Sequence, residues 1–163
     1  MQTAEKHIRY QQARIEIQSV LAGEQLAHLK MATINCVLKT HLPYYFWVGF
    51  YLKRQGKEEL SIGAYQGTLG CLHIPYSKGV CGRAARTQAV QIVADTHSDP
   101  EHIACDAASL SEIVVPVFDY QQNLIAVFDV DSLDLDSFDQ VDADYLQLIL
   151  NEQFAVAPLE YIY

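Results

Sequence analysis

Two pairs of β-rich segments, each joined by a short polar turn, constrain the fold of this chain most. Residues 45–53 are rich in aromatic and β-branched side chains, and the polar turn 54–57 separates them from a second segment at 59–66. Residues 112–118 and 124–131 repeat this arrangement around a turn at 119–123. Strands joined by so few residues pair antiparallel, because a parallel pair needs a much longer crossover. The sequence therefore predicts two hairpins in an antiparallel sheet.

Helical segments precede and follow the hairpins. We expect helices over residues 4–22, 24–40 and 138–154, a short helix over 79–86 and a short strand over 90–93. The closing helix has acidic residues at its start, where the helix dipole favours them. In the first two helices, apolar residues recur at helical spacing at Ile8, Ile15, Leu21, Leu26, Leu29, Ile34, Val37 and Leu38.

Two long segments, 66–82 and 94–111, are rich in glycine or irregular in pattern. In an α+β fold, helices cover one face of the antiparallel sheet, and we expect these loops to enclose a pocket on the other face. We expect one domain over residues 1–163. It comprises amino-terminal helices at 1–40, the sheet, loops and closing helix at 41–153, and a tail at 154–163.

Composition excludes several classes of partner. The net charge is −9 and the eleven lysines and arginines are scattered, so we expect no nucleic acid as partner. No apolar run is long enough to span a membrane, and the first residues lack the apolar core of a signal peptide. We therefore expect a cytoplasmic protein, in which four cysteines indicate catalysis, metal binding or burial rather than a disulfide framework.

Three of the cysteines, Cys71, Cys81 and Cys105, lie in the two pocket-forming segments, whereas Cys36 is expected to pack in the core. Cys105 stands in HIACDAASLSEIVVP, among small and polar residues that suit a reactive thiol. Two such thiols brought together support redox chemistry through a sulfenic acid and a disulfide. Histidines in the same segments also allow a metal site, but the spacings fit no common zinc pattern, so we expect none.

Acidic and aromatic residues also mark the hairpins. Glu112 begins one strand, and Asp129 and Asp131, two residues apart, share a face of another. They form either an exposed strand end or a cluster in which one acid has a raised pKa and donates a proton, or which binds an ammonium group. Trp47 and Tyr51 also share a strand face, either as sheet core or as an aromatic wall for a methyl or sulfur group.

Four motifs together resemble the free methionine-(R)-sulfoxide reductase family, which is built on a GAF domain. They are WVGFY, GAYQGTLGCLHIPYSKGVCG, HIACDAASLSEIVVP and FDVDS, and the resemblance covers about residues 45–148. The cysteine intervals of ten and twenty-four residues make it specific. Ser77 stands where glycine is usual and His73 where arginine is expected, and the tail after Gln153 is atypical.

The resemblance implies a GAF-like sheet, a role for each site residue and a reaction. Cys105 would attack the sulfoxide and become a sulfenic acid, Cys71 would form a disulfide with it, and Cys81 would be a second thiol able to help. External thioredoxin, fed by NADPH, would reduce the disulfide, with no bound cofactor. Glu112, Asp129 and Asp131 would contact the oxygen and amino group of the substrate, with Glu112 or Asp131 as proton donor; Trp47 and Tyr51 would hold its methylthio end.

Selectivity for the free amino acid would follow from two charges, because the acids need an ammonium group and backbone N–H groups at 77–82 suit a carboxylate. The length of the amino-terminal helices is compatible with a homodimer. Two other functions remain open. One is a GAF module that senses a small molecule without chemistry, and the other is a thiol redox sensor in which the disulfide is the signal.

Overall fold

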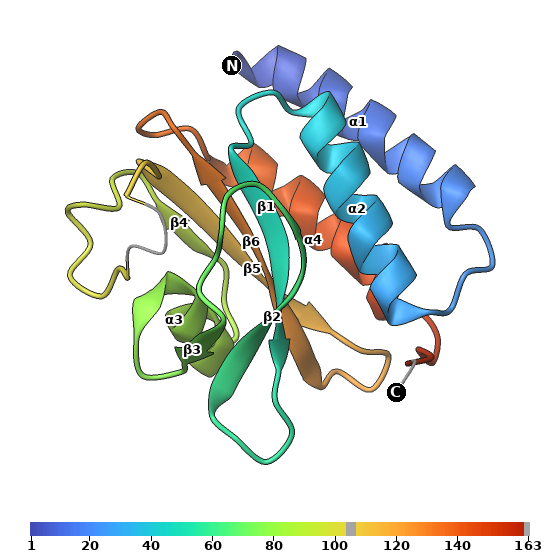
Figure 1. Ribbon diagram of the computed structural model, residues 1–163. Coiled ribbons are helices and arrows are strands. Elements are labelled where there is room, and N and C mark those ends of the chain that lie inside the picture. Colours follow the sequence, from blue (N-terminus) through green and yellow to red (C-terminus); the bar gives the residue numbers. More distant parts are fainter. Residues whose placement is uncertain (104–106, 162–163) are drawn as a thin grey trace.

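A six-stranded antiparallel sheet forms the centre of the protein, whose computed structural model describes residues 1–103 and 107–161 (Figure 1). The strands lie in the order β3-β2-β1-β6-β5-β4, so the two predicted hairpins are confirmed and sit side by side. Their bounds are β1 Trp47–Lys53, β2 Glu59–Gln66, β3 His73–Pro75, β4 Gln91–Val93, β5 Ser111–Phe118 and β6 Leu124–Ser132. The sequence pattern missed β3, because three residues are too few for a periodicity and only pairing with β2 reveals them.

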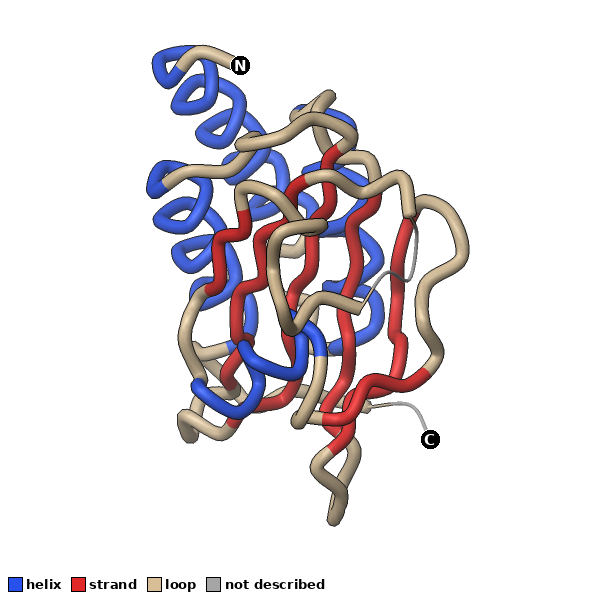
Figure 2. Tube along the Cα trace, turned by 90° about the vertical axis from the view of Figure 1, so that its left-hand side faces the viewer, coloured by secondary structure: helices blue, strands red, loops and turns tan. Residues whose placement is uncertain are grey.

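Three long helices cover one face of the sheet, and a short helix covers the other (Figure 2). The long helices are α1 Thr3–Val20, α2 Ala27–His41 and α4 Gln140–Phe154; the short helix is α3 Gly79–Thr87. The short helix α3 therefore lies on the opposite face from the long helices. Its side chains Val80, Ala84 and Ala85 are buried on the pocket side of the sheet, together with the loops.

The alternation of side chains along each strand divides the core into two layers. On the side of the long helices, Val48, Phe50 and Phe128 pack with residues of α1, α2 and α4. On the opposite side, Trp47 and Tyr51 join the apolar face of α3. Among the helices of the described residues, none combines the length and apolarity that crossing a membrane requires.

The face that α1 buries differs from the apolar spacing seen in the sequence. Ile8 and Ile15 are 57% and 60% exposed, while the buried side chains of α1 are Lys6, Tyr10, Ala13 and Ile17.

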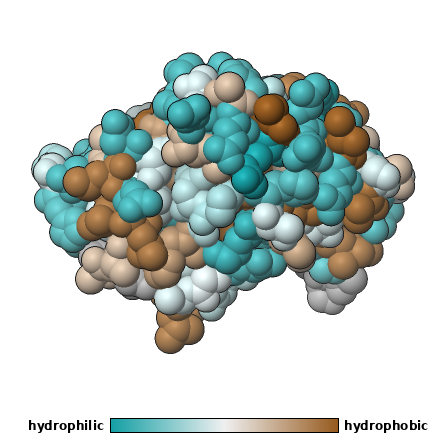
Figure 3. Space-filling model, turned by 90° about the horizontal axis from the view of Figure 1, so that it is seen from above, coloured by the Kyte–Doolittle hydropathy of each residue, from teal (hydrophilic) through white to brown (hydrophobic). Residues whose placement is uncertain are grey.

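The end of the molecule near the N-terminus presents hydrophilic residues at its centre and apolar patches toward either side (Figure 3). A homodimer through the amino-terminal helices stays a prediction.

Cys36, which was expected in the core, is exposed on α2, so that prediction is wrong. The nearest apolar residues on either side of it in the sequence, Ile34 and Val37, are both buried. On a helix, adjacent positions point about 100° apart, so an apolar flank on both sides does not place the residue between them in the core. The spacing of its neighbours in the sequence was therefore a poor guide to its burial.

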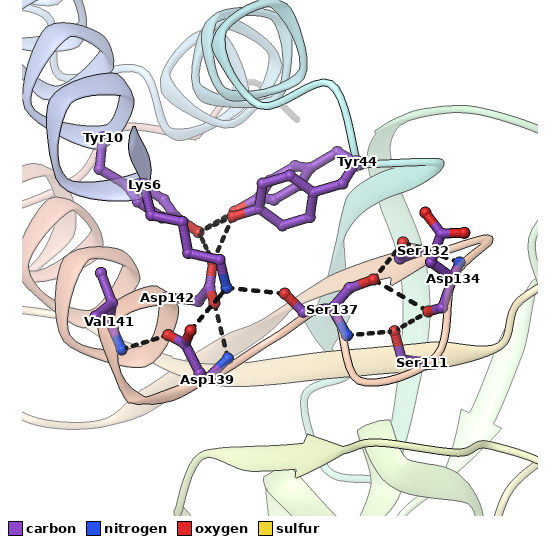
Figure 4. A network of polar contacts seen from close by, with 11 residues as sticks. Lys6, Tyr10, Tyr44, Ser111, Ser132, Asp134, Ser137, Asp139, Val141 and Asp142 are labelled. Atoms are coloured by element: carbon purple, nitrogen blue, oxygen red, sulfur yellow. Dashed lines mark hydrogen bonds and ion pairs between the residues drawn. The ribbon is translucent and has the colours of Figure 1, made fainter. Parts of the chain in front are cut away.

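A buried polar network ties α1 to the sheet (Figure 4). Lys6 is 2% exposed, and its ammonium group donates to the Ser137 carbonyl at 2.8 Å, to Asp139 at 3.0 Å and to Asp142. The Ser137 N–H donates to Ser111 Oγ at 3.3 Å, and its hydroxyl donates to Ser132 Oγ at 2.8 Å. Ser111 directly precedes Glu112, and Ser132 directly follows Asp131. The network therefore holds the strand ends that carry two of the predicted site acids.

Candidate functional site

A pocket opens on the side of the sheet that α3 covers. Its walls come from β1, β5 and β6, from the first turn of α3 and from the loop that precedes β5. It is lined by most of the residues predicted for the site: Trp47, Tyr51, Cys81, Glu112, Asp129 and Asp131. The predicted pocket between the two long segments is therefore present, and α3 forms part of its wall.

One wall of the pocket is aromatic. Trp47 stacks on Tyr51 with ring centroids 5.8 Å apart, and on Tyr65 at 5.4 Å. The indole N–H donates to the Thr68 carbonyl at 3.0 Å, which fixes the plane of the ring. Gly67 makes this approach possible, because its φ is +140° and a Cβ there would lie 2.6 Å from Trp47 Cδ1. The predicted aromatic wall exists as a surface, and its role toward a substrate stays a prediction.

The three predicted acids face the same pocket because of the strand register. Glu112 on β5 lies directly opposite Asp131 on β6, and Asp131 lies opposite Trp47 on β1. Two residues along β6, Asp129 points to the same face. Glu112 and Asp129 are 5% and 6% exposed, and Asp131 is half-buried. These acids are therefore a cluster in the pocket rather than an exposed strand end.

The acids are held in an environment that favours their neutral forms. Burial raises the pKa of Glu112, with Asp131 adding to the effect, and burial together with Glu112 raises the pKa of Asp129. Glu112 and Asp129 share a hydrogen bond. One oxygen of each, Glu112 Oε2 and Asp129 Oδ1, has no hydrogen-bond partner among the described residues. Unpaired buried oxygens of this kind are rare, and here they indicate space for a polar ligand.

The cysteines fall into different surroundings. Cys81 lies in the first turn of α3, is 3% exposed, and hydrogen-bonds to Asp129. Burial raises the pKa of its thiol, and Asp129 and Glu112 add to the rise, so Cys81 is a protonated thiol in the pocket wall. Cys71 is half-buried and packs against the same apolar cluster, next to the pocket-lining Gly70. Cys105 lies outside the described residues.

Three side chains of the pocket lie close enough together to coordinate a cation. One ligand atom from each of Cys81, Glu112 and Asp129 lies within 4.8 Å of the others. A divalent cation would have to displace the protons that their raised pKa values retain and that their mutual hydrogen bonds use. Protons shared among these three side chains are therefore an alternative to a metal ion as the reason they lie so close together. The expected absence of a metal stays a prediction.

The predicted carboxylate-binding turn is partly occupied by the protein itself. The Lys78 N–H donates to the Pro75 carbonyl at 3.1 Å, and the Gly79 N–H donates to the Glu101 carbonyl at 2.9 Å. The next two amides, of Val80 and Cys81, have no acceptor within the part of the chain that the structure describes. Both residues line the pocket. At the first turn of a helix such amides attract an anion. The backbone N–H groups left for a carboxylate are therefore those of Val80 and Cys81, fewer than the predicted range 77–82 suggested.

Sequence reasoning gave no role in the pocket to two of the residues that line it, His102 and Ser109. The imidazole Nδ1 of His102 lies 3.3 Å from Glu112 Oε2, although His102 was considered only as a metal ligand. Both residues belong to the HIACDAAS stretch, so the motif itself was the available signal. Hydrophobic periodicity and amino-acid composition do not indicate which side chains of an irregular loop face a pocket.

The GAF domain family matches residues 40–153 of this chain. The free methionine-R-sulfoxide reductase of Escherichia coli (strain K12) is 35% identical over 147 residues, which cover 90% of this chain and 87% of that protein. The protein of the same name from Saccharomyces cerevisiae is 44% identical over 102 residues, 62% of this chain and 57% of that protein.

Solved structures agree with these relatives. The X-ray structure of free methionine-R-sulfoxide reductase from Neisseria meningitidis, in complex with its substrate, is 40% identical and has a TM-score of 0.83. The match covers 89% of this chain and 87% of that chain. Family, sequence identity and fold all lead to the same assignment, so the chain belongs to the GAF-domain family of free methionine-(R)-sulfoxide reductases.

Proposed function

We propose that this protein is an oxidoreductase that reduces free L-methionine-(R)-sulfoxide to L-methionine. One observation carries the proposal. Glu112 Oε2 and Asp129 Oδ1 are buried, lack hydrogen-bond partners among the described residues and line the same pocket as the Trp47–Tyr51 wall. An amino acid with one charged end and one methylthio end matches such a pocket. Two relatives named for this reaction support the same substrate class.

Each end of the substrate has a complementary surface. The ammonium group pairs with the acid cluster and favours ionisation of one of its carboxyl groups. The methylthio end packs on Trp47 and Tyr51, as sulfur does on aromatic rings. The carboxylate accepts from the first-turn amides of Val80 and Cys81, which have no acceptor among the described residues. A sulfoxide within a peptide has neither charged group, so binding it would leave buried polar atoms unpaired.

The chemistry requires a nucleophile and a proton donor. In the proposed step the Cys105 thiolate attacks the sulfoxide sulfur, and Glu112 or Asp131 protonates the oxygen. The attack forms an S–S bond between Cys105 and the substrate sulfur. The hydroxyl oxygen then passes to the Cys105 sulfur while this S–S bond and the S–O bond of the substrate break, which leaves methionine and a sulfenic acid. The cysteine sulfur loses two electrons and the methionine sulfur gains them. The raised pKa of Glu112 supports its role as donor, since burial favours the protonated form of the acid.

Regeneration follows by thiol chemistry. Cys71 attacks the sulfenic acid, water leaves, and a disulfide between Cys71 and Cys105 forms. Thioredoxin then reduces this disulfide with electrons from NADPH, so the protein needs no bound cofactor of its own. Cys81 is a second thiol in the pocket wall, and the high pKa of this thiol makes it a slow nucleophile until a conformational change exposes it.

The test is a reductase assay with thioredoxin, thioredoxin reductase and NADPH. The three substrates are free methionine-(R)-sulfoxide, its S epimer and a peptide-bound sulfoxide. We expect turnover of the free R epimer alone, its loss in Cys105→Ser, and unchanged turnover in the control Cys36→Ser, because Cys36 is exposed on α2. No turnover of any substrate by folded, reduced protein would overturn the proposal in favour of a sensing module.

A further inference from the structure

His102 is the one imidazole that lines the pocket within the described part of the chain, and its neighbour there is a site acid. Its Nδ1 lies 3.3 Å from Glu112 Oε2, and the two side chains are only 14% and 7% exposed. Glu112 Oε2 is one of the unpaired buried oxygens, so the imidazole touches it without the alignment of a hydrogen bond. Contacts between catalytic groups often tighten only when the substrate binds.

Several bonds from α3 hold His102 at this position. Its backbone N–H donates to the Asp99 carbonyl at 3.2 Å. The Asp99 carboxylate accepts two hydrogen bonds from Arg83 of α3, at 3.1 Å and 2.7 Å. Next to His102, the Glu101 carbonyl accepts from the Gly79 N–H at 2.9 Å. The same helix that lines the pocket with Cys81 therefore sets the place of the imidazole.

The charges around the pair favour one pattern of protons. Burial lowers the pKa of His102, and Asp99 opposes this shift. Burial raises the pKa of Glu112; Asp131 and Asp99 raise it further, while Asp129 and Arg83 act in the opposite direction. Both shifts favour the uncharged forms, a neutral imidazole beside a protonated carboxyl group. A neutral imidazole still carries one N–H, and in the tautomer with its hydrogen at Nδ1 a small rotation of the ring would let it donate to Oε2.

During the reaction, Glu112 requires a hydrogen-bond donor that its protonated form does not require. Once Glu112 gives its proton to the sulfoxide oxygen, it becomes a buried carboxylate next to other acids. Forming such a charge is costly unless a donor stabilises it, and a hydrogen bond to a charged group is about twice as strong as a neutral one. The imidazole is already in contact with the oxygen that would need that donor.

We propose that His102 is a positioning residue that acts through Glu112. Its Nδ1–H donates to Glu112 Oε2 while the carboxyl group gives its proton to the sulfoxide oxygen. This inference rests on the proposed function. The protons balance: the Cys105 thiol loses one, the sulfoxide oxygen gains one from Glu112, and the proton released by the thiol restores Glu112 after methionine leaves.

The decisive experiment compares His102→Leu with His102→Asn. Leucine fills space without a donor, whereas the asparagine amide places an N–H close to the position of Nδ1. The matched control is His97→Leu, because His97 lies in the same loop, is 59% exposed and pairs only with Asp95 at 3.8 Å among the described residues. For each protein, methionine formation by the pre-reduced enzyme is followed in a single turnover at several substrate concentrations, which separates the chemical rate from substrate affinity.

We expect His102→Leu to lose about 10- to 100-fold in the single-turnover rate, as for loss of a hydrogen bond to a charge, with affinity changed less than about threefold. His102→Asn should keep most of the rate, and His97→Leu all of it. Because the lost donor stabilises the Glu112 carboxylate, its removal raises the pKa of Glu112. The alkaline limb of the rate profile should therefore move to higher pH in His102→Leu.

Two results would overturn the inference while leaving the proposed function intact. One is a His102→Leu enzyme as fast as the wild type with an unmoved pH profile. The other is equal loss of rate in the Leu and Asn variants, since a donor at the Nδ1 position would then have no effect. A wild-type protein that reduces no sulfoxide would overturn the proposed function and the inference together.

Discussion

Replacing Lys6 by methionine tests whether the buried network is the main link between α1 and the rest of the domain. The Lys6 ammonium group is held by the Ser137 carbonyl, by Asp139 and by Asp142, and it lies 5.3 Å from the centre of the Tyr44 ring. Asp142 is fully buried. Methionine keeps the length and apolar stem of the side chain but removes the charge and its three donors.

The expected loss follows from the state of Asp142 after the substitution. Breaking a buried ion pair by removing one partner destabilises a protein by about 3–5 kcal/mol, because the remaining charge is buried without a counter-charge. Asp142 keeps donors from the Tyr10 hydroxyl at 2.8 Å, from the Tyr44 hydroxyl and from the Asp139 N–H at 2.8 Å. These place the loss toward the lower end, at about 3 kcal/mol. For a domain of this size that corresponds to a fall in Tm of about 6–12 °C.

Urea denaturation measures the free energy of unfolding of Lys6→Met against the wild type. The matched control is Arg9→Met on the same helix, whose ion pair with Glu5 is 37% and 48% exposed. Surface pairs contribute about 0–1 kcal/mol, so Arg9→Met should lie near the wild type. Adding Asp142→Asn to Lys6→Met removes the stranded charge and should recover part of the loss. A Lys6→Met protein within about 1 kcal/mol of the wild type would refute the reasoning.

Three further predictions concern the acids of the pocket, the approach of Gly67 to Trp47, and the exposed surface of α2. Because burial raises the pKa of Glu112 and Asp129, the folded protein keeps protons that the unfolded chain releases, so the free energy of unfolding should fall as pH rises above the usual carboxyl range. Urea titrations at acidic and neutral pH should show a smaller fall in Glu112→Gln, and an equal fall would contradict this. Gly67→Ala, with a Cβ 2.6 Å from Trp47, should destabilise the fold by about 1–3 kcal/mol and shift the fluorescence of the single tryptophan; an unchanged spectrum and stability would refute the close approach. Cys36 is exposed, so a maleimide should label it rapidly in the folded protein, whereas slow labelling would show that it is buried.

Most of the fold was predictable because its elements carry local signals. The hairpins at β1–β2 and β5–β6 follow from apolar runs joined by short polar turns, and both turned out to be neighbours in the sheet. The failures have a common cause. β3 exists only through its pairing with β2, and the buried face of α1 is set by partners such as Asp142, which lies far away in the sequence. The hydrophobic periodicity within one segment cannot indicate partners that lie far away in the sequence.

The residues of the candidate site also fall into two groups, those that the sequence predicted and those that only the structure revealed. The spacing of Asp129 and Asp131 placed both on one strand face, and the register of β5 against β6 brings Glu112 into the same pocket. The contact of His102 with Glu112 could not be predicted, because an irregular loop has no period that says which side chain turns inward. Cys105 lies outside the described residues, so its role stays a proposal.

The sequence by itself determined the four helices and every strand except β3, and its motifs identified the family. Those properties depend on neighbours a few positions away, where steric and hydrogen-bonding preferences act. Only the tertiary structure decided that Cys81 of α3 lies against Asp129 of β6, with Glu112 of β5 beside them. Burial among distant segments is also what moves the pKa values of these three groups, since desolvation depends on everything packed around a group.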